Sequence, residues 1–572
     1  LSATEERFVI TMAKANRKPP LEKNAFYFIP LGGSEEFGVN LNVYLCDGQY
    51  LAVDCGLGFA DERYPGIDIV LPDPAYLEQH RHALKGLIIT HAHEDHIGAV
   101  AHLWPRLQCP LYASPFTAAV LRQKLKDAGL QHVPVHIVRP LDALEIGAFF
   151  VRFIPVAHSI PHSCALAIET AYGRVLHSGD WNLDPTPVIG DPVDPAHFKA
   201  EGDKGVLAYI GDSTNAEVAG RAGSERDIEF GMEQEFRKCK GRIAVTMFSS
   251  NISRVITIAR AAKKCGRDVG VIGRSLHRMI AAAQECDLLG DMPEFLSEED
   301  LGYLPDERAV MIVTGSQGES RAALSKMARG EHPSVTLKRG DTVIFSARAI
   351  PGNEVNINLV RNNLCAAGVH VVTPSDTDNI IHVSGHPCRD EITEMYQWVR
   401  PKVVIPVHGE RIQLEAQAML ARGCQVPEAL VPSNGSVIRL APGPVETIDH
   451  VATGLLAVEE KRIIAADHAA IAARRKLQFT GAVHVSLVLD GRGRLLGEPK
   501  IDTVGLIDPE LPGEEQILDR LHDEVLDLLE ELSFEELLDD HFVSEEVRIG
   551  VRRFVVHVLG LKPQTTVHVI RV

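Results

Sequence analysis

Three histidines and two acidic residues fall within six positions of the segment THAHEDHIGA, at residues 90–99. His91, His93, Asp95 and His96 directly follow the apolar run GLIIT, which is typical of a buried strand. Imidazoles and carboxylates are ligands for borderline divalent metals such as zinc and manganese. A lone histidine in a turn is usually structural, so the interpretation depends on whether distant residues complete a ligand set.

Several other predicted strands also end in a histidine or an aspartate. Asp54 follows YLAV, His158 follows FFVRFIPV, Asp180 follows RVLHSG, Asp212 follows AYIG, His386 follows IIHVSG, and His408 follows VVIPV. Because the ends of neighbouring strands converge on one rim of a sheet, we expect these side chains to meet.

The spacing favours two ions over one, because an HxHxDH turn cannot aim four side chains at a single ion. Two ions about 3.5–4 Å apart can share them. One ion is predicted to bind His91, His93 and His158. The other is predicted to bind Asp95, His96 and His408, with Asp180 bridging the pair. The expected cofactor is therefore two divalent ions per subunit, zinc or manganese.

The elements that position these residues fall into distinct stretches of an α/β chain. After an N-terminal extension at 1–24, residues 25–222 alternate short apolar runs with turns, which predicts a strand-rich sandwich. Residues 223–375 alternate strands with helices, the pattern of a parallel sheet with crossover helices. The first pattern returns at 376–450, so the middle block is an insertion. A partly helical linker at 451–475 and an α/β unit at 476–572 follow.

Composition sets limits on partner and compartment. No apolar run of the 572 residues is long enough to span a bilayer, and the N-terminal segment shows no secretory apolar region. Ten scattered cysteines without a CxxC motif fit a reducing cytoplasm. The net charge is −19, but residues 508–546 hold 16 acidic residues against one arginine. The remaining chain is nearly neutral, so a polyanionic substrate is not excluded.

The motifs carry a resemblance to a known family. HAHEDH resembles the signature of the metallo-β-lactamase fold, and DSTN (212–215), HVSGH (382–386) and PVHGE (406–410) resemble the β-CASP nucleases. Within that group, HSIP (158–161), SGDWNLDPTP (178–187), SSNISR (249–254), TGSQGE (314–319) and IPGNE (350–354) resemble the ribonuclease J family. The chain departs from that family at His162, where its members have an acidic residue.

The resemblance implies a metallo-β-lactamase αββα sandwich, an inserted β-CASP domain and a small α/β C-terminal domain for oligomerisation. It also implies a bacterial enzyme of rRNA processing and mRNA decay, with endonuclease activity and 5′→3′ exonuclease activity that prefers a 5′-monophosphate. Single-stranded RNA, homodimers or homotetramers, and an RNA-degradation complex are the implied partners.

Individual roles can be assigned within this interpretation. Asp180 positions the attacking water, Asp95 accepts its proton, and His386 donates a proton to the leaving oxygen. The resemblance places Asp212 behind His386. Turns after strands bind phosphate well, so a 5′-phosphate pocket is predicted from Ser384, Gly385, His386, Ser346 and Arg348. Arginines at the strand–helix turns are predicted to line the RNA channel, namely Arg254, Arg274, Arg278 and Arg321.

Three alternatives stay open at this point. The first is another metallohydrolase on the same core, although the insertion argues against it. The second is a DNA-processing β-CASP nuclease, although such relatives carry a different residue where His408 stands. The third is a non-catalytic scaffold or RNA-binding subunit of a degradation complex, although every expected ligand position is filled.

Overall fold

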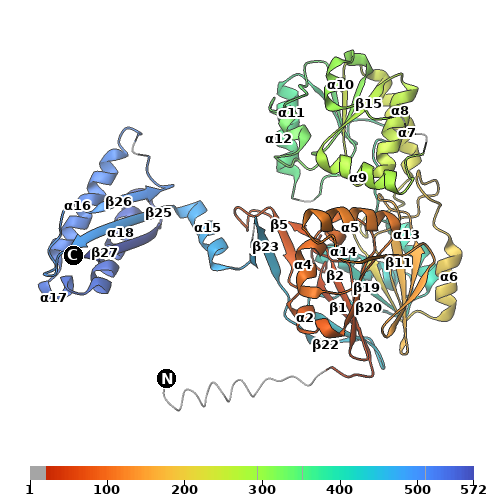
Figure 1. The fold of residues 1–572 in the computed structure, drawn as a ribbon, viewed down its shortest axis with the longest axis horizontal. Helices are drawn as coiled ribbons and strands as arrows, with labels where there is room; N and C mark the ends of the chain where they lie inside the picture. Colours follow the sequence, from red (N-terminus) through yellow and green to blue (C-terminus); the bar gives the residue numbers. More distant parts are fainter. Residues whose placement is uncertain (1–20, 291, 293, 351, 461, 509) are drawn as a thin grey trace. The chain divides into compact units, whose positions relative to one another are not determined.

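The computed structural model (Figure 1) describes residues 21–290, 292, 294–350, 352–460, 462–508 and 510–572. Most of the predicted N-terminal extension therefore lies outside the described residues. The chain divides into two compact units. One contains the chain up to Gly58 together with Leu71–Gly454, and the other contains Phe59–Val70 with Leu455–Val572.

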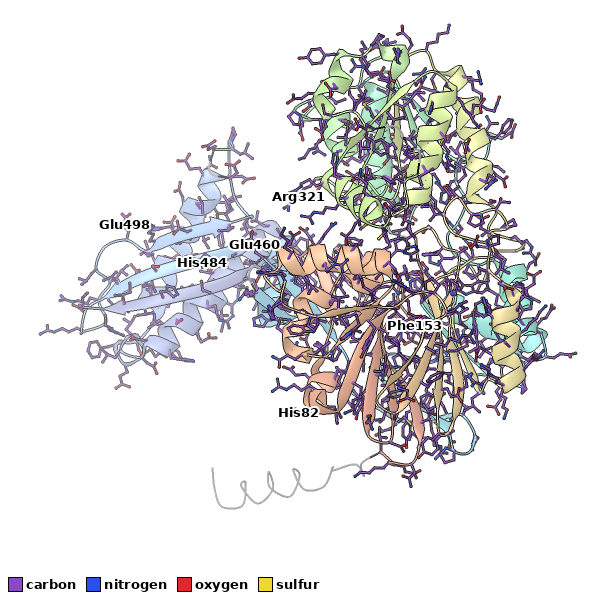
Figure 2. All side chains as sticks on the ribbon, turned by 45° about the vertical axis from the view of Figure 1, so that its right-hand side comes forward. His82, Phe153, Arg321, Glu460, His484 and Glu498 are labelled. Atoms are coloured by element: carbon purple, nitrogen blue, oxygen red, sulfur yellow. The ribbon has the colours of Figure 1, made fainter. Side chains whose placement is uncertain are left out.

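The first unit is built on two packed sheets. The eight-stranded sheet has the order β22 (Glu446–His450), β21 (Ser436–Ala441), β1 (Phe26–Gly32), β2 (Leu41–Cys46), β3 (Gln49–Val53), β6 (Leu84–Ile89), β7 (Leu111–Ala113) and β8 (Val135–Ile137). The seven-stranded sheet has the order β20 (Glu428–Ala429), β19 (Val403–Val407), β13 (Ala208–Asp212), β12 (Gly173–His177), β11 (Cys164–Thr170), β10 (Phe149–Pro155) and β9 (Ala143–Ile146). Both sheets contribute to one apolar core, which includes Phe153 of β10, labelled in Figure 2.

Helices cover the outer faces of this sandwich. Apolar residues of α6 (Pro195–Lys204), α13 (Arg389–Val399) and α14 (Arg411–Gly423) form a second core with β12, β13 and β19. Helix α5 (Pro115–Asp127) contacts β7 and β8 in the other sheet. The predicted αββα sandwich is therefore confirmed.

The inserted block folds as predicted into a five-stranded sheet whose pairings are all parallel. Its order is β15 (Asp268–Ile272), β16 (Ala309–Val313), β14 (Ile243–Thr246), β17 (Thr342–Phe345) and β18 (His370–Val372). The helices of this block are α7 (Glu225–Lys238), α8 (Ile252–Lys264), α9 (Arg274–Glu285), α10 (Glu298–Tyr303), α11 (Ala323–Ala328) and α12 (Glu354–Ala366). Figure 1 shows these helices around the sheet.

The chain returns to the sandwich after the insertion and completes both of its sheets. Strand β19 pairs in parallel with β13, with Ile210 opposite Ile405, and β21 pairs antiparallel with β1. As a result, the carboxyl ends of β12, β13 and β19 lie side by side, and those of β3 and β6 lie together in the other sheet.

One strand predicted from the sequence is wrong. NIIHVSGH at 379–386 forms a loop, and no strand is assigned there. The physical reason is that side chains satisfy its backbone carbonyls in place of a strand ladder. The Ser346 hydroxyl donates to Ile381 O, and the imidazole of His158 hydrogen-bonds Gly385 O.

Arg254 is also placed differently from the prediction that it lines an RNA channel. Its side chain is 1% exposed and forms an ion pair with Glu225, at the start of α7. The guanidinium also donates to the backbone and hydroxyl oxygens of Ser346, at 2.8 and 2.6 Å. Arg254 therefore fixes the point where the insertion begins.

The second unit contains a three-stranded sheet of β26 (Lys500–Val504), β25 (Ala482–Leu489) and β27 (Gln564–Arg571). One face packs on α16 (Glu515–Glu531) and α18 (Asp540–Leu559), while His484 of β25, labelled in Figure 2, is exposed. The predicted linker at 451–475 holds more order than expected, since β23 (Leu455–Glu459) and β24 (Arg462–Ala465) form an antiparallel pair before α15 (Ala469–Thr480).

We expect Arg254→Met to destabilise the protein because it leaves the Glu225 carboxylate without its buried cation. Breaking one side of a buried pair typically costs about 3–5 kcal/mol. The midpoint of urea unfolding should fall clearly, and the double variant Arg254→Met with Glu225→Leu should recover much of the loss. An unchanged midpoint in the single variant would contradict the structural role.

Candidate metal centre

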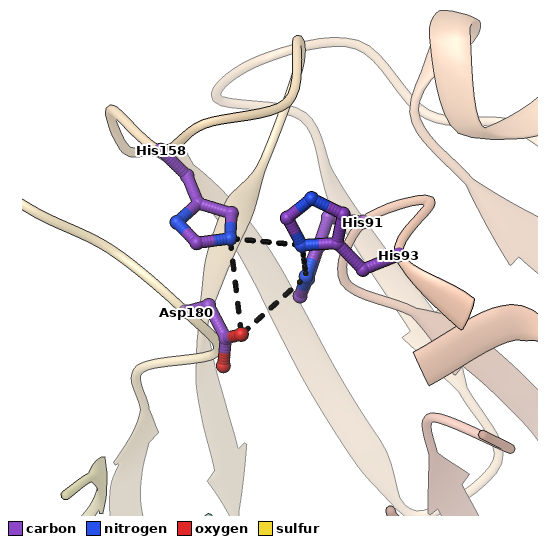
Figure 3. A group of neighbouring side chains, drawn as sticks. All are labelled: His91, His93, His158 and Asp180. Carbon is purple, nitrogen blue, oxygen red and sulfur yellow. Dashed lines mark hydrogen bonds and ion pairs between the residues drawn. The ribbon is translucent and has the colours of Figure 1, made fainter. Parts of the chain in front are cut away.

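Two groups of predicted ligands converge at the carboxyl ends of the strands. In the first group, His91 Nε2 lies 3.1 Å from His93 Nδ1, and His158 Nε2 lies 3.0 Å from the same atom. Asp180 Oδ2 lies 3.6 Å from His91 Nε2 and 3.8 Å from His158 Nε2 (Figure 3). The ligand atoms of these four residues all lie within 4.8 Å of one another.

The second group lies on the other side of the same carboxylate. Asp180 Oδ2 is 3.2 Å from His96 Nε2 and 3.7 Å from His408 Nε2. Asp95 Oδ2 completes the group at 3.0 Å from His408 Nε2. The structure thus brings together all seven residues that the sequence predicted as ligands, in the two sets expected.

Asp180 Oδ2 is the shared atom of both groups, and it tests whether divalent ions fit here. It is buried and has no hydrogen-bond partner among the described residues. A buried carboxylate oxygen without a hydrogen bond is costly. A divalent cation beside this oxygen would remove that cost, so the donor set fits divalent metal.

Asp54 and Thr90 fix the orientation of two imidazoles of the turn at residues 91–96. Asp54 Oδ2 is 2.8 Å from His96 Nδ1, which leaves His96 Nε2 directed at Asp180. The Thr90 hydroxyl donates its hydrogen to Asp54. Toward His91 Nδ1, 3.0 Å away, it can therefore act only as an acceptor, so His91 Nδ1 carries the proton. One carboxylate, that of Asp54, therefore orients a ligand in each group.

The loop at 384–386 supports the opposite side of the site. His158 Nδ1 lies 2.6 Å from Gly385 O, so its Nε2 carries the lone pair that faces His93. A Cβ atom on Gly385 would lie 2.9 Å from the His158 ring and 2.8 Å from Ser159 Oγ. Only glycine allows this close approach of backbone to ligand.

His386 and Asp212 lie beside the second group. His386 Nδ1 is 2.9 Å from Asp212 Oδ2, and the His386 ring stacks on that of His408 with centroids 5.6 Å apart. Thr214 Oγ1 donates to Asp212 and lies 2.8 Å from His408 Nδ1. Asp212 is therefore in contact with the residue that it was predicted to support.

Burial and neighbouring charges set the protonation of the site. Burial lowers the pKa of His91 and His93 well below the usual value, and that of His158 to about 4. Their imidazoles are therefore neutral at neutral pH, the form that binds metal. Burial alone would raise the pKa of Asp180, but the imidazoles of His408 and His96 hold it well below its ordinary range.

The predicted phosphate pocket is organised by a residue that the sequence reasoning missed. Asn215 is buried, and its amide donates to Ser384 Oγ at 2.8 Å and to His386 O at 3.1 Å. Its Oδ1 accepts from the exposed Arg348. Asn215 is the last residue of the DSTN motif, which was the signal that could have identified it.

Ser346 does not lie on the open side of that pocket. It is 1% exposed, its hydroxyl donates to Ile381 O, and it accepts from Arg254. The geometry therefore argues against direct contact between Ser346 and a phosphate, because the residue is sealed behind the loop that carries Ser384.

A cavity of about 520 Å³ adjoins the first ligand group and is lined by His158, His162, Asn182 and Ser384, among others. His162 Nδ1 accepts from the backbone N–H of Phe116, in the first turn of α5. The imidazole of His162 thus satisfies an N-terminal donor of that helix, in place of the acidic residue expected there.

Family models match most of the chain. The metallo-beta-lactamase superfamily matches residues 38–221, and the ribonuclease J beta-CASP domain matches 240–364. The Zn-dependent metallo-hydrolase RNA specificity domain matches 375–427, and the ribonuclease J C-terminal domain matches 469–572. Four stretches of the chain are thus similar to known domains.

Whole-chain relatives agree with these matches. The ribonuclease J of Sinorhizobium meliloti is 42% identical over 551 residues, covering 95% of this chain and 97% of the relative. That of Mycolicibacterium smegmatis is 35% identical and covers 97% and 99%. A solved structure of a protein of unknown function from Enterococcus faecalis V583 has a TM-score of 0.50 at 15% identity, covers 73% of this chain and 100% of that one, and supports the fold alone.

Asp54→Asn should weaken metal binding, because an amide cannot accept all the hydrogen bonds from Thr90 and His96. The expected loss of Mn²⁺ affinity in a titration is about 10- to 100-fold, as for other residues that orient ligands. Asp47→Asn is the matched control, since both aspartates have a left-handed backbone (φ 62° and 50°) that asparagine tolerates. Equal affinities in the two variants would disprove the orienting role.

Proposed function

Because the chain belongs to the ribonuclease J family, we propose that it hydrolyses RNA at the site built around Asp180, both endonucleolytically and as a 5′→3′ exonuclease. A metal-dependent ribonuclease is the activity that the family relationship supports. The observation that carries the local assignment is the single carboxylate oxygen, Asp180 Oδ2, shared by two ligand groups and otherwise unpartnered.

The proposed cofactor is two divalent ions per subunit, zinc or manganese. His91, His93 and His158 would hold one, Asp95, His96 and His408 would hold the other, and Asp180 would bridge them. Such ions acidify water and neutralise charge on a phosphoryl group.

The residues of the chain supply the proton transfers. Water attacks the phosphorus atom, the bond to the 3′-oxygen breaks, and the Asp95 carboxylate takes the proton of the attacking water. His386 is the proposed proton donor to the leaving 3′-oxygen. Asp212 engages His386 Nδ1, so Nε2 is the nitrogen left to face the substrate.

A 5′-phosphate pocket beside His386 would explain exonuclease action. Ser384, Gly385 and Arg348 offer a hydroxyl, a backbone N–H and a guanidinium, and Asn215 holds this group together. Guanidinium and hydroxyl donors suit a terminal monophosphate. Arg348 is exposed and bound only to an uncharged amide among the described residues, so its charge is not neutralised by an acid.

We also propose that the C-terminal unit mediates self-association into a dimer or tetramer. Strand β27 is an edge strand whose residues alternate between exposed and half-buried, and Ile570 on it is 50% exposed. None of the described helices is long and apolar enough to cross a membrane.

His91→Ala and Asp180→Ala should abolish cleavage of labelled RNA while the circular dichroism spectrum stays native. Metal analysis should give two ions per chain in the wild type and fewer in both variants. His132→Ala, an exposed histidine outside the site, should behave as the wild type. Normal turnover in either ligand variant would refute the assignment.

Ser384→Ala should reduce the preference for 5′-monophosphate over 5′-hydroxyl RNA by about tenfold, the effect of losing one hydrogen bond to a charged group. Initial rates on the two labelled RNAs give this ratio. Endonucleolytic cleavage of a circular RNA should be nearly unchanged, and the exposed Ser334→Ala serves as the control. If the ratio of the rates on the two RNAs does not change, Ser384 does not contact the 5′-phosphate.

A further inference from the structure

A small hollow lies at the inner side of the metal centre, where β2 and β12 of the two sheets face each other. Its volume is about 10 Å³, and Asn42, His177 and Asp180 are among its lining residues. All of its lining residues except Gly179 and Val407 have polar side chains. A polar space of roughly 10–15 Å³ is the size that holds one water molecule.

Asn42 has an unsatisfied acceptor at this hollow. The residue is 3% exposed, and its Oδ1 has no hydrogen-bond partner within the described part of the chain. Buried amide oxygens without a partner are rare in native proteins, and an ordered water can supply the missing hydrogen bond. The hollow is therefore the place where this partner would sit.

His177 offers a donor to the same space. Its Nδ1 lies 3.0 Å from the Tyr44 hydroxyl, and both residues are buried. Burial raises the pKa of Tyr44 well above its ordinary value and lowers that of His177 to about 4, so both groups are neutral. The Tyr44 O–H has no other acceptor in the described residues, so it donates to Nδ1. The proton of His177 is then on Nε2, for which the described residues provide no acceptor.

Asp180 supplies the third group. Figure 3 shows one of its carboxyl oxygens directed at His91 and His158 and the other pointing away from them. Asp54 and Asp212 also line the hollow. The oxygens of Asp54 already accept from Thr90 or His96, and those of Asp212 are engaged by Thr214 and His386. The second oxygen of Asp180 is therefore the carboxylate acceptor that remains.

We propose that the hollow holds one ordered water molecule that accepts from His177 Nε2–H and donates to Asn42 Oδ1 and to Asp180 Oδ1. This water gives Asn42 Oδ1 the partner that it lacks among the described residues, and it also engages His177 Nε2 and Asp180 Oδ1. It also anchors the inner oxygen of Asp180, so that Oδ2 stays between the two ligand groups. Asn42 and His177 are thus positioning residues that act on the centre through the water.

The presence of this water is independent of the proposed reaction, whereas its effect on metal binding rests on the proposed metal centre. The two can be tested separately. If the water density is present but the protein does not cleave RNA, the proposal of the water stands and the proposed reaction is refuted.

The first test is a crystal structure of the wild-type protein at a resolution that shows ordered water. The expected result is a density peak within hydrogen-bond distance of Asn42 Oδ1, His177 Nε2 and Asp180 Oδ1. An empty or closed hollow would overturn the proposal.

The second test is Asn42→Leu, which removes the acceptor and fills the space with a side chain of similar size. We expect the water peak to disappear and the Mn²⁺ affinity, measured by titration with the metal alone, to fall about tenfold or more. Thr246→Val is the matched control, because Thr246 Oγ1 is also buried and unpartnered but belongs to the inserted sheet. Unchanged affinity in a folded Asn42→Leu protein would overturn the positioning role. If that variant does not fold, the wild-type density decides.

Discussion

The physical constraint on which the molecule depends is the gathering of imidazoles and carboxylates around one oxygen, Asp180 Oδ2. These groups come from separate turns that follow β6, β10, β12 and β19. Without a cation, Asp180 Oδ2 is a buried carboxylate oxygen that has no hydrogen bond from the described residues. Four of the five imidazoles are held by a hydrogen bond at the other ring nitrogen. That N–H donates to Asp54 from His96, to Thr90 from His91, to Gly385 O from His158 and to Thr214 from His408. These hydrogen bonds fix the orientation of the ligands, and metal binding adds to the stability of the folded state.

The same rigidity links the metal centre to substrate selection. The loop at 384–386 contacts a ligand through Gly385 O, a proposed proton donor through His386 and a proposed phosphate site through Ser384. Asn215 ties the last two together. This loop connects the inserted domain to the sandwich, so the junction and the site share one segment of chain. The buried Arg254, which holds both Glu225 and Ser346, stabilises the junction from the other side.

Much of the site could be predicted from the sequence because polar residues at strand ends leave a local signal. The HxHxDH spacing, Asp180 after its strand, and His408 after VVIPV each depend only on short-range patterns. The strand–helix alternation of the insertion is equally local. The prediction of a strand at 379–386 failed because side chains of distant residues bond the carbonyls of Ile381 and Gly385, which no periodicity encodes. Burial of Arg254 and Ser346, and the strands β23 and β24 in the presumed linker, likewise depend on tertiary partners. No sequence pattern marks Asn42, because its amide oxygen becomes buried without a partner only when the two sheets pack together.

The parallel pairing of β19 with β13 has a consequence for synthesis on the ribosome. His408 stands at the end of β19, nearly two hundred residues after Asp212 ends β13. In a nascent chain, the inserted domain can therefore fold before the ligand set is complete. The last imidazole is synthesised only after the whole insertion, so tight metal binding requires that translation has passed His408.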